Sequence, residues 1–583
     1  MKRTHIVLIA IGVIVALTRL LAAAHSLWEW DEALFCLGVR DYSVAMHHPH
    51  PPGFPLYILL GKLFRFVTGD EFRALRAVNV FSAMLVFPAT YLLARELTLE
   101  VMPSISAALL TCFAPNVWFY GGTAFSDEPT LVMLLIGAAL LLRGRTSRGA
   151  YFAGCIVMAA ACVMRPQNVL LGAYPFLAGS WPRWKERKRD PILGALLMFV
   201  IIAAFFGGAA YVTGFDAYRQ ALRDHSQYVL SIDSFHNPGR APWFKTYRQF
   251  LLDPYGAGRI STVIAIFAAI GLLRARRPVL ESLAIFGPFV IFCLFMLNPE
   301  SGGRYAVTSM PMLMICCAEG IAVGCAVARL RGRVAIAAQA VVVLAIAGKL
   351  IVWTLPALAE VREHDAPTYA AMMWVRQHID PKQSTIYVSE LDPIADYLLP
   401  DYRRSTIDSA LPAVSLSDAN AWLVAEHASA ARGAVNFTRP HGHLFAISRK
   451  RYFEVSVRPM VPNVAFLDGW YGEESGGGEI WRWMGQHSSM RLEPLAGKGE
   501  LALIFDVPLD AEPRKPVATI SVNGQVLERI VCNTRMEKRW IVSSNAQAPN
   551  VLTIDVDEVA KGVDPRDLGL RLRAISWRSL EGK

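Results

Sequence analysis

The sequence predicts a polytopic α-helical membrane protein with a C-terminal part that is soluble in composition. Of the 583 residues, 54% are hydrophobic and only 18% are charged. The hydrophobic residues gather into long runs, as membrane helices require and soluble cores do not. These runs stop near residue 355, and polar residues are frequent from there on. We therefore expect a transmembrane domain over residues 1–355, followed by an extramembrane part.

The first hydrophobic run, residues 6–24, is long enough to cross a bilayer and follows two basic residues. A signal peptide has a similar pattern, but the many later runs favour a retained helix. Each later run approaches the length of about 20 residues that a membrane helix needs, so that about eleven spans are predicted in all. The later runs lie at residues 77–94, 102–120, 129–142, 150–164, 168–181, 191–213, 260–273, 279–297, 305–328 and 334–355.

Clusters of basic residues give the predicted spans a direction. They lie at residues 143–148, 181–190, 274–277 and 329–333. Because basic residues concentrate in cytoplasmic loops, threading from a cytoplasmic N-terminus places all of these clusters on the cytoplasmic side. The net charge of +10 then reflects topology, and we do not interpret it as a sign of nucleic-acid binding. The threading predicts a multi-pass protein of the cytoplasmic (inner) membrane with an extracytoplasmic C-terminal part.

The extramembrane part divides into two segments by its pattern. Residues 356–459 combine a helical pattern with a strand-like stretch, TIYVSE, which predicts a small α/β segment. Residues 460–583 contain short apolar or alternating runs between turn residues, which predicts a jelly-roll-like β-sandwich. The aromatic-rich stretch at residues 469–485 is suited to stacking on sugar rings. It is equally suited to a sandwich core followed by a glycine-rich turn.

Ionisable residues gather just outside the first predicted span. Asp31 and Glu32 follow it directly, where charge is costly against lipid and tolerable in a water-filled cavity. The stretch HHPHPPGFP at residues 47–55 comes next, and its prolines predict a rigid, non-helical loop that contains His50. The alternative for the acidic pair, taken alone, is that the two residues only mark the membrane interface and have no part in a site.

Two further groups lie on the same predicted side of the membrane. Asp127 and Glu128 form a second acidic pair, preceded by WFYGGTAFS. Arg304 and Tyr305 follow two glycines at the outer start of a late span, where an arginine is placed to bind a phosphate with two parallel hydrogen bonds. The alternative for Arg304 is a side chain that only extends to the interface.

The order of these motifs resembles the GT-C class of membrane glycosyltransferases. The resemblance extends over residues 1–355 and is strongest to bacterial members similar to protein O-mannosyltransferases and aminoarabinose transferases. It is carried by the first acidic pair, HPPG, an S-D-x-P motif, R-P-Q at residues 165–167 and G-G-R-Y at residues 302–305. The C-terminal sandwich resembles carbohydrate-binding jelly rolls more loosely.

The resemblance implies a GT-C-like fold and a hexosyl- or pentosyltransferase. Such an enzyme takes a sugar from a polyprenyl-phosphate carrier in the membrane and passes it to a glycan, lipid or protein acceptor outside the cytoplasm. Some members of the class use a divalent metal ion and others do not. This sequence has no clear metal-ligand spacing, so the resemblance makes no cofactor certain.

The resemblance also implies roles for individual residues. Asp31 matches the catalytic acidic position and is expected to be the base, with Glu32 as its alternative. The other expected roles are acceptor orientation or metal binding for Asp127 and Glu128, cavity lining for His50, and lipid-phosphate binding for Arg304, Tyr305 and Arg165. A structural role is an equal alternative for His50 in its loop and for Arg165 at a helix end.

Two other classes of protein compete with an enzyme as explanations of this sequence. Transporters also bury acids, but their sites typically lie near the membrane midplane and arise from internal repeats, whereas these acids lie at one water-facing edge. A sugar-binding surface protein with a membrane anchor explains the sandwich but leaves the other spans without a purpose. A membrane transporter of a lipid-linked or sugar substrate is therefore the second interpretation.

Overall fold

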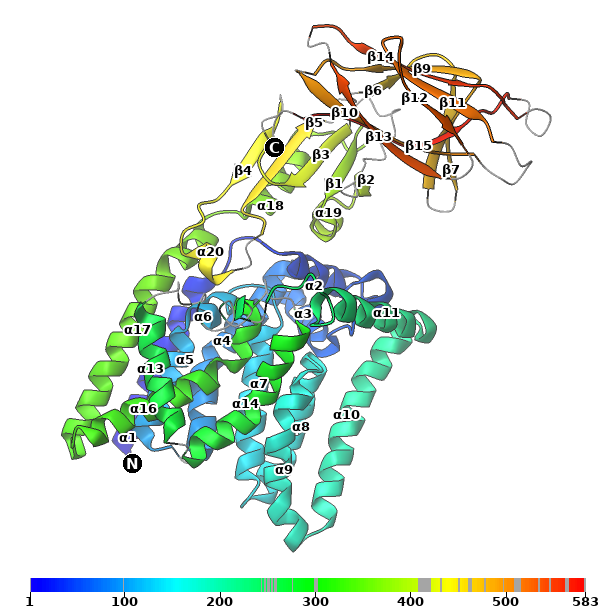
Figure 1. Ribbon diagram of the computed structural model, residues 1–583. Coiled ribbons are helices and arrows are strands. Elements are labelled where there is room, and N and C mark those ends of the chain that lie inside the picture. The colour runs from blue at the N-terminus through cyan, green and yellow to red at the C-terminus, as the bar shows by residue number, and fades with distance from the viewer. Residues whose placement is uncertain are drawn as a thin grey trace. The chain divides into compact units, whose positions relative to one another are not determined.

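The structure is a computed structural model that describes most of the chain (Figure 1). It falls into two compact units, Met1–Ala370 with Thr438–Glu454, and Ala371–Phe437 with Val455–Lys583. The described residues are 2–97, 99–242, 259–274, 276–297, 302–406, 421–429, 433–448, 451–459, 464–476, 479–495, 497–507, 515–532, 535–544, 547–560 and 566–580, with a few between 244 and 255. Residues 298–301 of the predicted loop before Arg304 lie outside them.

The first unit is helical, and every hydrophobic run of the sequence lies on one or two of its helices. The helices are α1 (Lys2–Arg19), α2 (Trp30–Arg40), α3 (Pro55–Thr68), α4 (Glu71–Glu96), α5 (Val101–Phe113), α6 (Pro115–Tyr120), α7 (Asp127–Arg143), α8 (Arg148–Met164), α9 (Asn168–Glu186), α10 (Arg189–Thr213), α11 (Phe215–Tyr228), α13 (Arg259–Leu273), α14 (Arg277–Met296), α15 (Gly302–Tyr305), α16 (Met310–Val327), α17 (Gly332–Glu363) and α20 (Leu444–Ile447). The short turns η1 (Leu20–Ala22), η2 (Val44–Met46), η3 (Val229–Asp233) and η6 (Ala306–Ser309) join them.

Among the described residues, 6 helices are long and apolar enough to cross a membrane. They are His5–Ala22, Glu71–Glu96, Arg189–Thr213, Arg277–Met296, Gly303–Val327 and Gly332–His378. Shorter apolar helices lie at Val101–Phe113, Arg148–Met164 and Arg259–Leu273. The chain is thus a multi-pass membrane protein, and the count of about eleven spans stays a prediction.

Small residues let the helices of this unit approach closely. Helix α7 packs between α4 and α8, and α13 packs along α16 (Figure 1). A Cβ on Gly320 would lie 1.8 Å from the carbonyl oxygen of Phe267, and one on Gly271 would lie 2.2 Å from that of Cys316. Backbones that touch in this way are typical of helix pairs in membranes, where apolar surface gains little from leaving lipid.

A second close approach fixes the turn before α7. The carbonyl oxygen of Gly122 accepts a hydrogen bond of 2.9 Å from the amide of Ala24. A Cβ on Gly122 would lie 1.6 Å from the carbonyl oxygen of Ala22. Gly122, the second glycine of the WFYGG motif, therefore lets the turn before α7 lie against the end of the first membrane helix, and both acidic pairs follow this junction.

The second unit begins with the predicted α/β segment. Its strands form one sheet in the order β2-β1-β3-β5-β4, in which β1 is parallel to β2 and β3, and β3 is antiparallel to β5. Its elements are α18 (Pro367–His378), β1 (Thr385–Ser389), α19 (Asp392–Leu398), β2 (Arg403–Thr406), β3 (Ala421–Glu426), β4 (Val435–Thr438) and β5 (Glu454–Pro459). The helix and the strand read from the sequence are α18 and β1.

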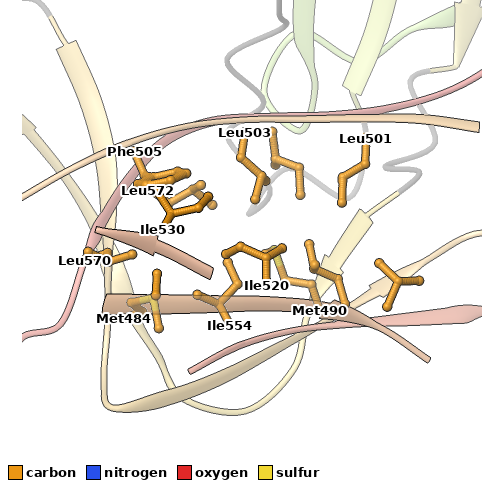
Figure 2. Close-up of a cluster of buried hydrophobic side chains, with 14 of the residues drawn as sticks. Met484, Met490, Leu501, Leu503, Phe505, Ile520, Ile530, Ile554, Leu570 and Leu572 are labelled. Carbon is orange, nitrogen blue, oxygen red and sulfur yellow. The ribbon is translucent and has the colours of Figure 1, made fainter. Parts of the chain in front are cut away.

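The rest of the second unit is a sandwich of two antiparallel five-stranded sheets. The sheets have the orders β13-β10-β15-β8-β7 and β12-β11-β14-β9-β6. Alternating apolar residues of both meet in one core, which includes Leu501, Ile520 and Ile554 (Figure 2). The strands are β6 (Val464–Phe466), β7 (Trp470–Gly476), β8 (Glu479–Met484), β9 (His487–Leu492), β10 (Lys498–Asp506), β11 (Val517–Val522), β12 (Gln525–Val531), β13 (Met536–Ser543), β14 (Asn550–Val556) and β15 (Arg571–Ser579). Membrane helices followed by a strand-rich region confirm the predicted order of the chain.

Part of the aromatic stretch of the sandwich serves the fold itself. Trp483 is buried, and Trp470 packs on Phe466 with the ring centroids 4.8 Å apart. The ring of Trp481 lies under the guanidinium groups of Arg571 and Arg573, at 5.1 and 4.9 Å. Carbohydrate binding by the sandwich stays a prediction.

The junction at Gly122 can be tested by adding a single methyl group. Gly122→Ala should lower the yield of folded protein and its melting temperature in detergent, because the Cβ meets a backbone carbonyl that cannot move aside. Gly149→Ala is the matched control, since a Cβ at that exposed helix position meets nothing within 4 Å and alanine favours helix. Equal melting temperatures for both variants would show that the junction tolerates a side chain.

Candidate active site

The two acids of the first pair occupy the first turn of α2 but do different things. Glu32 is buried, and its carboxylate accepts backbone N–H groups of Trp28 at 2.7 Å and of Glu29 at 2.9 Å. Its second oxygen accepts the N–H of Ala124 at 2.9 Å. Burial raises the pKa of Glu32 to about 7, against these hydrogen bonds, which lower it. Glu32 thus ties α2 to the turn before α7.

Asp31 lies next to Glu32 and makes a contact across the chain. Its Oδ2 accepts a hydrogen bond of 2.6 Å from Nη1 of Arg304, and a quarter of the Asp31 side chain (25%) is exposed. The two residues are 273 positions apart in the sequence. The structure therefore brings together the predicted base and the predicted phosphate ligand, at the N-terminus of a helix that favours a nearby negative charge.

The guanidinium of Arg304 is held on several sides. The side chain is only 6% exposed, and its guanidinium carbon lies 4.6 Å from the ring centroid of Phe125 and 5.1 Å from that of Tyr305. Its Nε faces Oδ2 of Asp127 at 4.0 Å and has no hydrogen-bond partner among the described residues. Stacked aromatic rings limit how this planar group can turn.

Asp127 forms an ion pair with Arg165. The carboxylate is fully buried, and the guanidinium of Arg165 donates to its two oxygens at 2.6 and 3.1 Å. The Nε of Arg165 donates to the hydroxyl of Ser126 at 3.0 Å. This bidentate pair joins the start of α7 to the end of α8. The guanidinium nitrogens of Arg165 therefore already donate to Asp127 and Ser126. Asp127 has no exposed surface that an acceptor could contact.

Glu128 stands apart from this group. Its side chain is buried, and neither carboxylate oxygen has a hydrogen-bond partner in the part of the chain that the structure describes. Arg19 of α1, and then Asp127, are the charged groups that act on it most strongly. Neighbouring residues on a helix point in different directions. Asp127 therefore pairs with Arg165, while Glu128 is influenced mainly by a different cation, Arg19.

His50 lies in the proline loop, close to the ion pair. Its ring lies 5.4 Å from that of Phe35 and 4.9 Å from that of Phe54. Burial lowers its pKa to about 4, although the charge of Asp31 acts in the opposite sense, so the ring is neutral at pH 7. Its Nδ1 is buried and has no partner among the described residues.

His225 of α11 was not among the residues predicted from the sequence. Its ring lies 6.1 Å from that of His50, and burial lowers its pKa while Asp31 raises it. Tyr218 and Ala221 are buried on the same helix. Ala221 follows Tyr218 by three residues and precedes His225 by four, which places all three on one face. That pattern was visible in the sequence, but nothing in it pointed to His50 as the partner.

No residue is assigned as a metal ligand. Within the described residues, no group of three or more His, Cys, Asp or Glu side chains is arranged to hold a metal ion. Asp127, which was expected to orient the acceptor or bind a metal, has both oxygens on Arg165.

Comparisons with known proteins agree with this architecture. Residues 42–140 match the family model described as the Protein O-mannosyl-transferase TMEM260 N-terminal domain. No curated protein matches the sequence. Among solved structures, ArnT from Cupriavidus metallidurans bound to undecaprenyl phosphate has a TM-score of 0.52 at 14% identity, covering 78% of this chain and 98% of ArnT.

Two further solved structures have a lower similarity to this chain. The apo form of the same ArnT has a TM-score of 0.49 at 13% identity, with 78% of this chain and 98% of that chain covered. The apo oligosaccharyltransferase of Archaeoglobus fulgidus has a TM-score of 0.48 at 10% identity, with coverages of 98% and 97%. The resemblance predicted from the motif order is confirmed at the level of the fold, which is that of the GT-C glycosyltransferases.

Proposed function

We propose that this protein is a glycosyltransferase that moves a sugar from a polyprenyl-phosphate carrier to an acceptor outside the cytoplasmic membrane. The observation that carries the proposal is the contact of Asp31 with Arg304. Of the four acids predicted for the site, Asp31 alone is paired with Arg304 at hydrogen-bond distance and partly exposed, in the region that the structure describes. The other three are buried, and each is engaged elsewhere or lacks a partner.

The chemistry of sugar transfer needs both members of this pair. An acceptor hydroxyl becomes a good nucleophile when a carboxylate takes its proton, and Asp31 is placed for that task. The acceptor oxygen bonds to the anomeric carbon as the bond from that carbon to the phosphate oxygen breaks. The phosphate leaves with the electron pair, and a guanidinium such as that of Arg304 stabilises the added negative charge.

The comparisons support the choice of donor class. The ArnT structure with the same fold was determined with undecaprenyl phosphate, and the matched family model carries the name of an O-mannosyltransferase. A lipid phosphate at the membrane edge also agrees with the position of Arg304, which begins a span. We propose a hexose or pentose as the sugar, and a glycan, lipid or protein as the acceptor.

His50 and His225 are proposed to contact the acceptor at this site. Both are neutral near pH 7 according to the direction of their pKa shifts, and a neutral imidazole can either donate or accept a hydrogen bond. Sugar and protein hydroxyl groups need partners of this kind. Glu32 is proposed to act only by positioning α2, since its carboxylate is taken up by backbone N–H groups.

The role of Asp31 can be tested by an isosteric change. Asp31→Asn keeps the size of the side chain but removes its ability to take a proton, so turnover should fall by about a hundredfold or more. The measurement is transfer of sugar from a labelled polyprenyl-phosphate donor by the purified protein. Asp224→Asn, an exposed position on α11, is the matched control and should behave like the parent. Near-parental turnover of Asp31→Asn would assign the base elsewhere.

Arg304 can be tested with one conservative and one severe change. Arg304→Lys keeps the charge but loses the planar fork, and should weaken use of the lipid-phosphate donor. Arg304→Ala should weaken it further, by about tenfold or more for each charged hydrogen bond removed. Donor KM is the measurement, and Arg73→Ala, at an exposed position of α4, is the control. An unchanged KM in both Arg304 variants would leave that side chain with a structural task only.

The proposed topology has its own test. A reporter that is active only in the cytoplasm should be silent when fused after Lys583, because the basic clusters place that end outside. The same reporter fused after Lys188, within a predicted cytoplasmic loop, should be active. Activity of the fusion after Lys583 would reverse the sidedness of the proposed site.

A further inference from the structure

The two groups to which the proposed reaction gives separate tasks are bonded to each other in the structure. Nη1 of Arg304 donates to Oδ2 of Asp31 at 2.6 Å. A cation at this distance favours the charged form of a carboxylate and makes it a weaker base. While this pair is intact, Asp31 is poorly suited to take a proton, and Arg304 lacks one of its donors for a phosphate.

Aromatic rings and two carboxylates surround Arg304 in the part of the chain that the structure describes. The rings of Phe125 and Tyr305 lie against the guanidinium, at 4.6 and 5.1 Å, and Asp127 lies on its Nε side at 4.0 Å. Arg304 itself is 6% exposed, whereas Asp31 is 25% exposed. Of the two carboxylates beside the guanidinium, Asp31 is thus the one that solvent and a ligand can reach, since Asp127 is fully buried.

Asp127 does not compete for this position. Both of its oxygens are held by Arg165 at 2.6 and 3.1 Å, so it stays in place when Asp31 moves. It keeps a negative charge beside Arg304, which holds the guanidinium in the site after the exchange. A buried cation left without any counter-charge would be strongly unfavourable.

We propose that the phosphate of the carrier lipid replaces Asp31 on Arg304, and that this exchange releases Asp31 as the base. The inference rests on the proposed function and adds the order of its events. Once Arg304 binds the phosphate, Asp31 loses the charged hydrogen bond from Arg304 and gains affinity for a proton. It then takes the proton of the acceptor hydroxyl, the acceptor oxygen bonds to the anomeric carbon, and the carrier phosphate leaves with the electron pair of the broken bond.

The same exchange in reverse resets the site. Asp31 gives its proton to solvent after the transfer and regains its charge. The charged carboxylate then competes with the carrier phosphate for Arg304 and favours release of the used carrier. In the absence of a donor, Asp31 is held as a weak base, which disfavours activation of an acceptor or a water before the donor is bound.

The exchange predicts that removing Asp31 improves binding of the carrier phosphate. The probe is undecaprenyl phosphate without a sugar, titrated into the purified full-length protein in detergent. Asp31→Asn and Asp31→Ala should each bind it about tenfold more tightly than the parent or better, because a competing charged hydrogen bond is worth at least about one tenfold step. Asp224→Asn removes the same charge from an exposed site and should bind like the parent, which separates competition from a change in net charge.

The outcomes distinguish this inference from the function on which it rests. If both Asp31 variants bind undecaprenyl phosphate no more tightly than the parent, while Arg304→Ala loses binding, the exchange is wrong and the carrier site stands. If the parent does not bind the probe, or binds it independently of Arg304, the exchange and the proposed carrier site both fall. Thermal unfolding of each variant, measured in the same detergent, identifies any change in affinity that arises from misfolding.

Discussion

A buried positive charge needs a counter-charge, and the arrangement of the site follows from how Arg304 is given one. The guanidinium lies between two aromatic rings at the start of a membrane helix, with carboxylates on two sides. One of these, Asp127, is fixed by its own arginine. The other, Asp31, lies at hydrogen-bond distance from Arg304 and is partly exposed, so it is the carboxylate that an incoming anion can displace.

Backbone contacts around the site fix the positions of these charged residues. Glu32 accepts three backbone N–H groups and so fixes the first turn of α2, from which Asp31 projects. Gly122 allows the following turn to touch the end of the first membrane helix. Glu32 and Gly122, which take no chemical part in the proposed reaction, therefore decide where the reacting residues lie, because a shift of either segment would separate Asp31 from Arg304.

The fold was predictable to the extent that it depends on hydrophobicity. Each long apolar run became a helix, since backbone groups in lipid must be satisfied within the segment. The short apolar run LALIFDV became β10, which is buried along most of its length, and the alternating run VLTIDV became β14, which has one buried face. Contacts between residues far apart in the chain were predicted only where the resemblance to GT-C glycosyltransferases placed those residues in one site. The His50 and His225 contact joins positions with no shared motif, so the sequence contained no sign of it.

The different surroundings of the two acids in each pair could not be predicted from the motifs. Two adjacent acids look equivalent in a sequence, yet neighbours on a helix point about 100° apart and meet different surroundings. Asp31 meets a cation and solvent, while Glu32 meets backbone donors. Asp127 meets Arg165, while Glu128 is acted on mainly by Arg19.

This division of each pair gives the site one mobile charge and one fixed charge beside the same arginine. A fixed carboxylate keeps Arg304 charged and in place, and a displaceable one can respond to the ligand. If both carboxylates were held as Asp127 is, neither would leave its place beside the guanidinium for a phosphate. If neither were held, the bound phosphate would be the sole counter-charge of a buried arginine, and its release after the reaction would be opposed by the cost of leaving that charge unpaired.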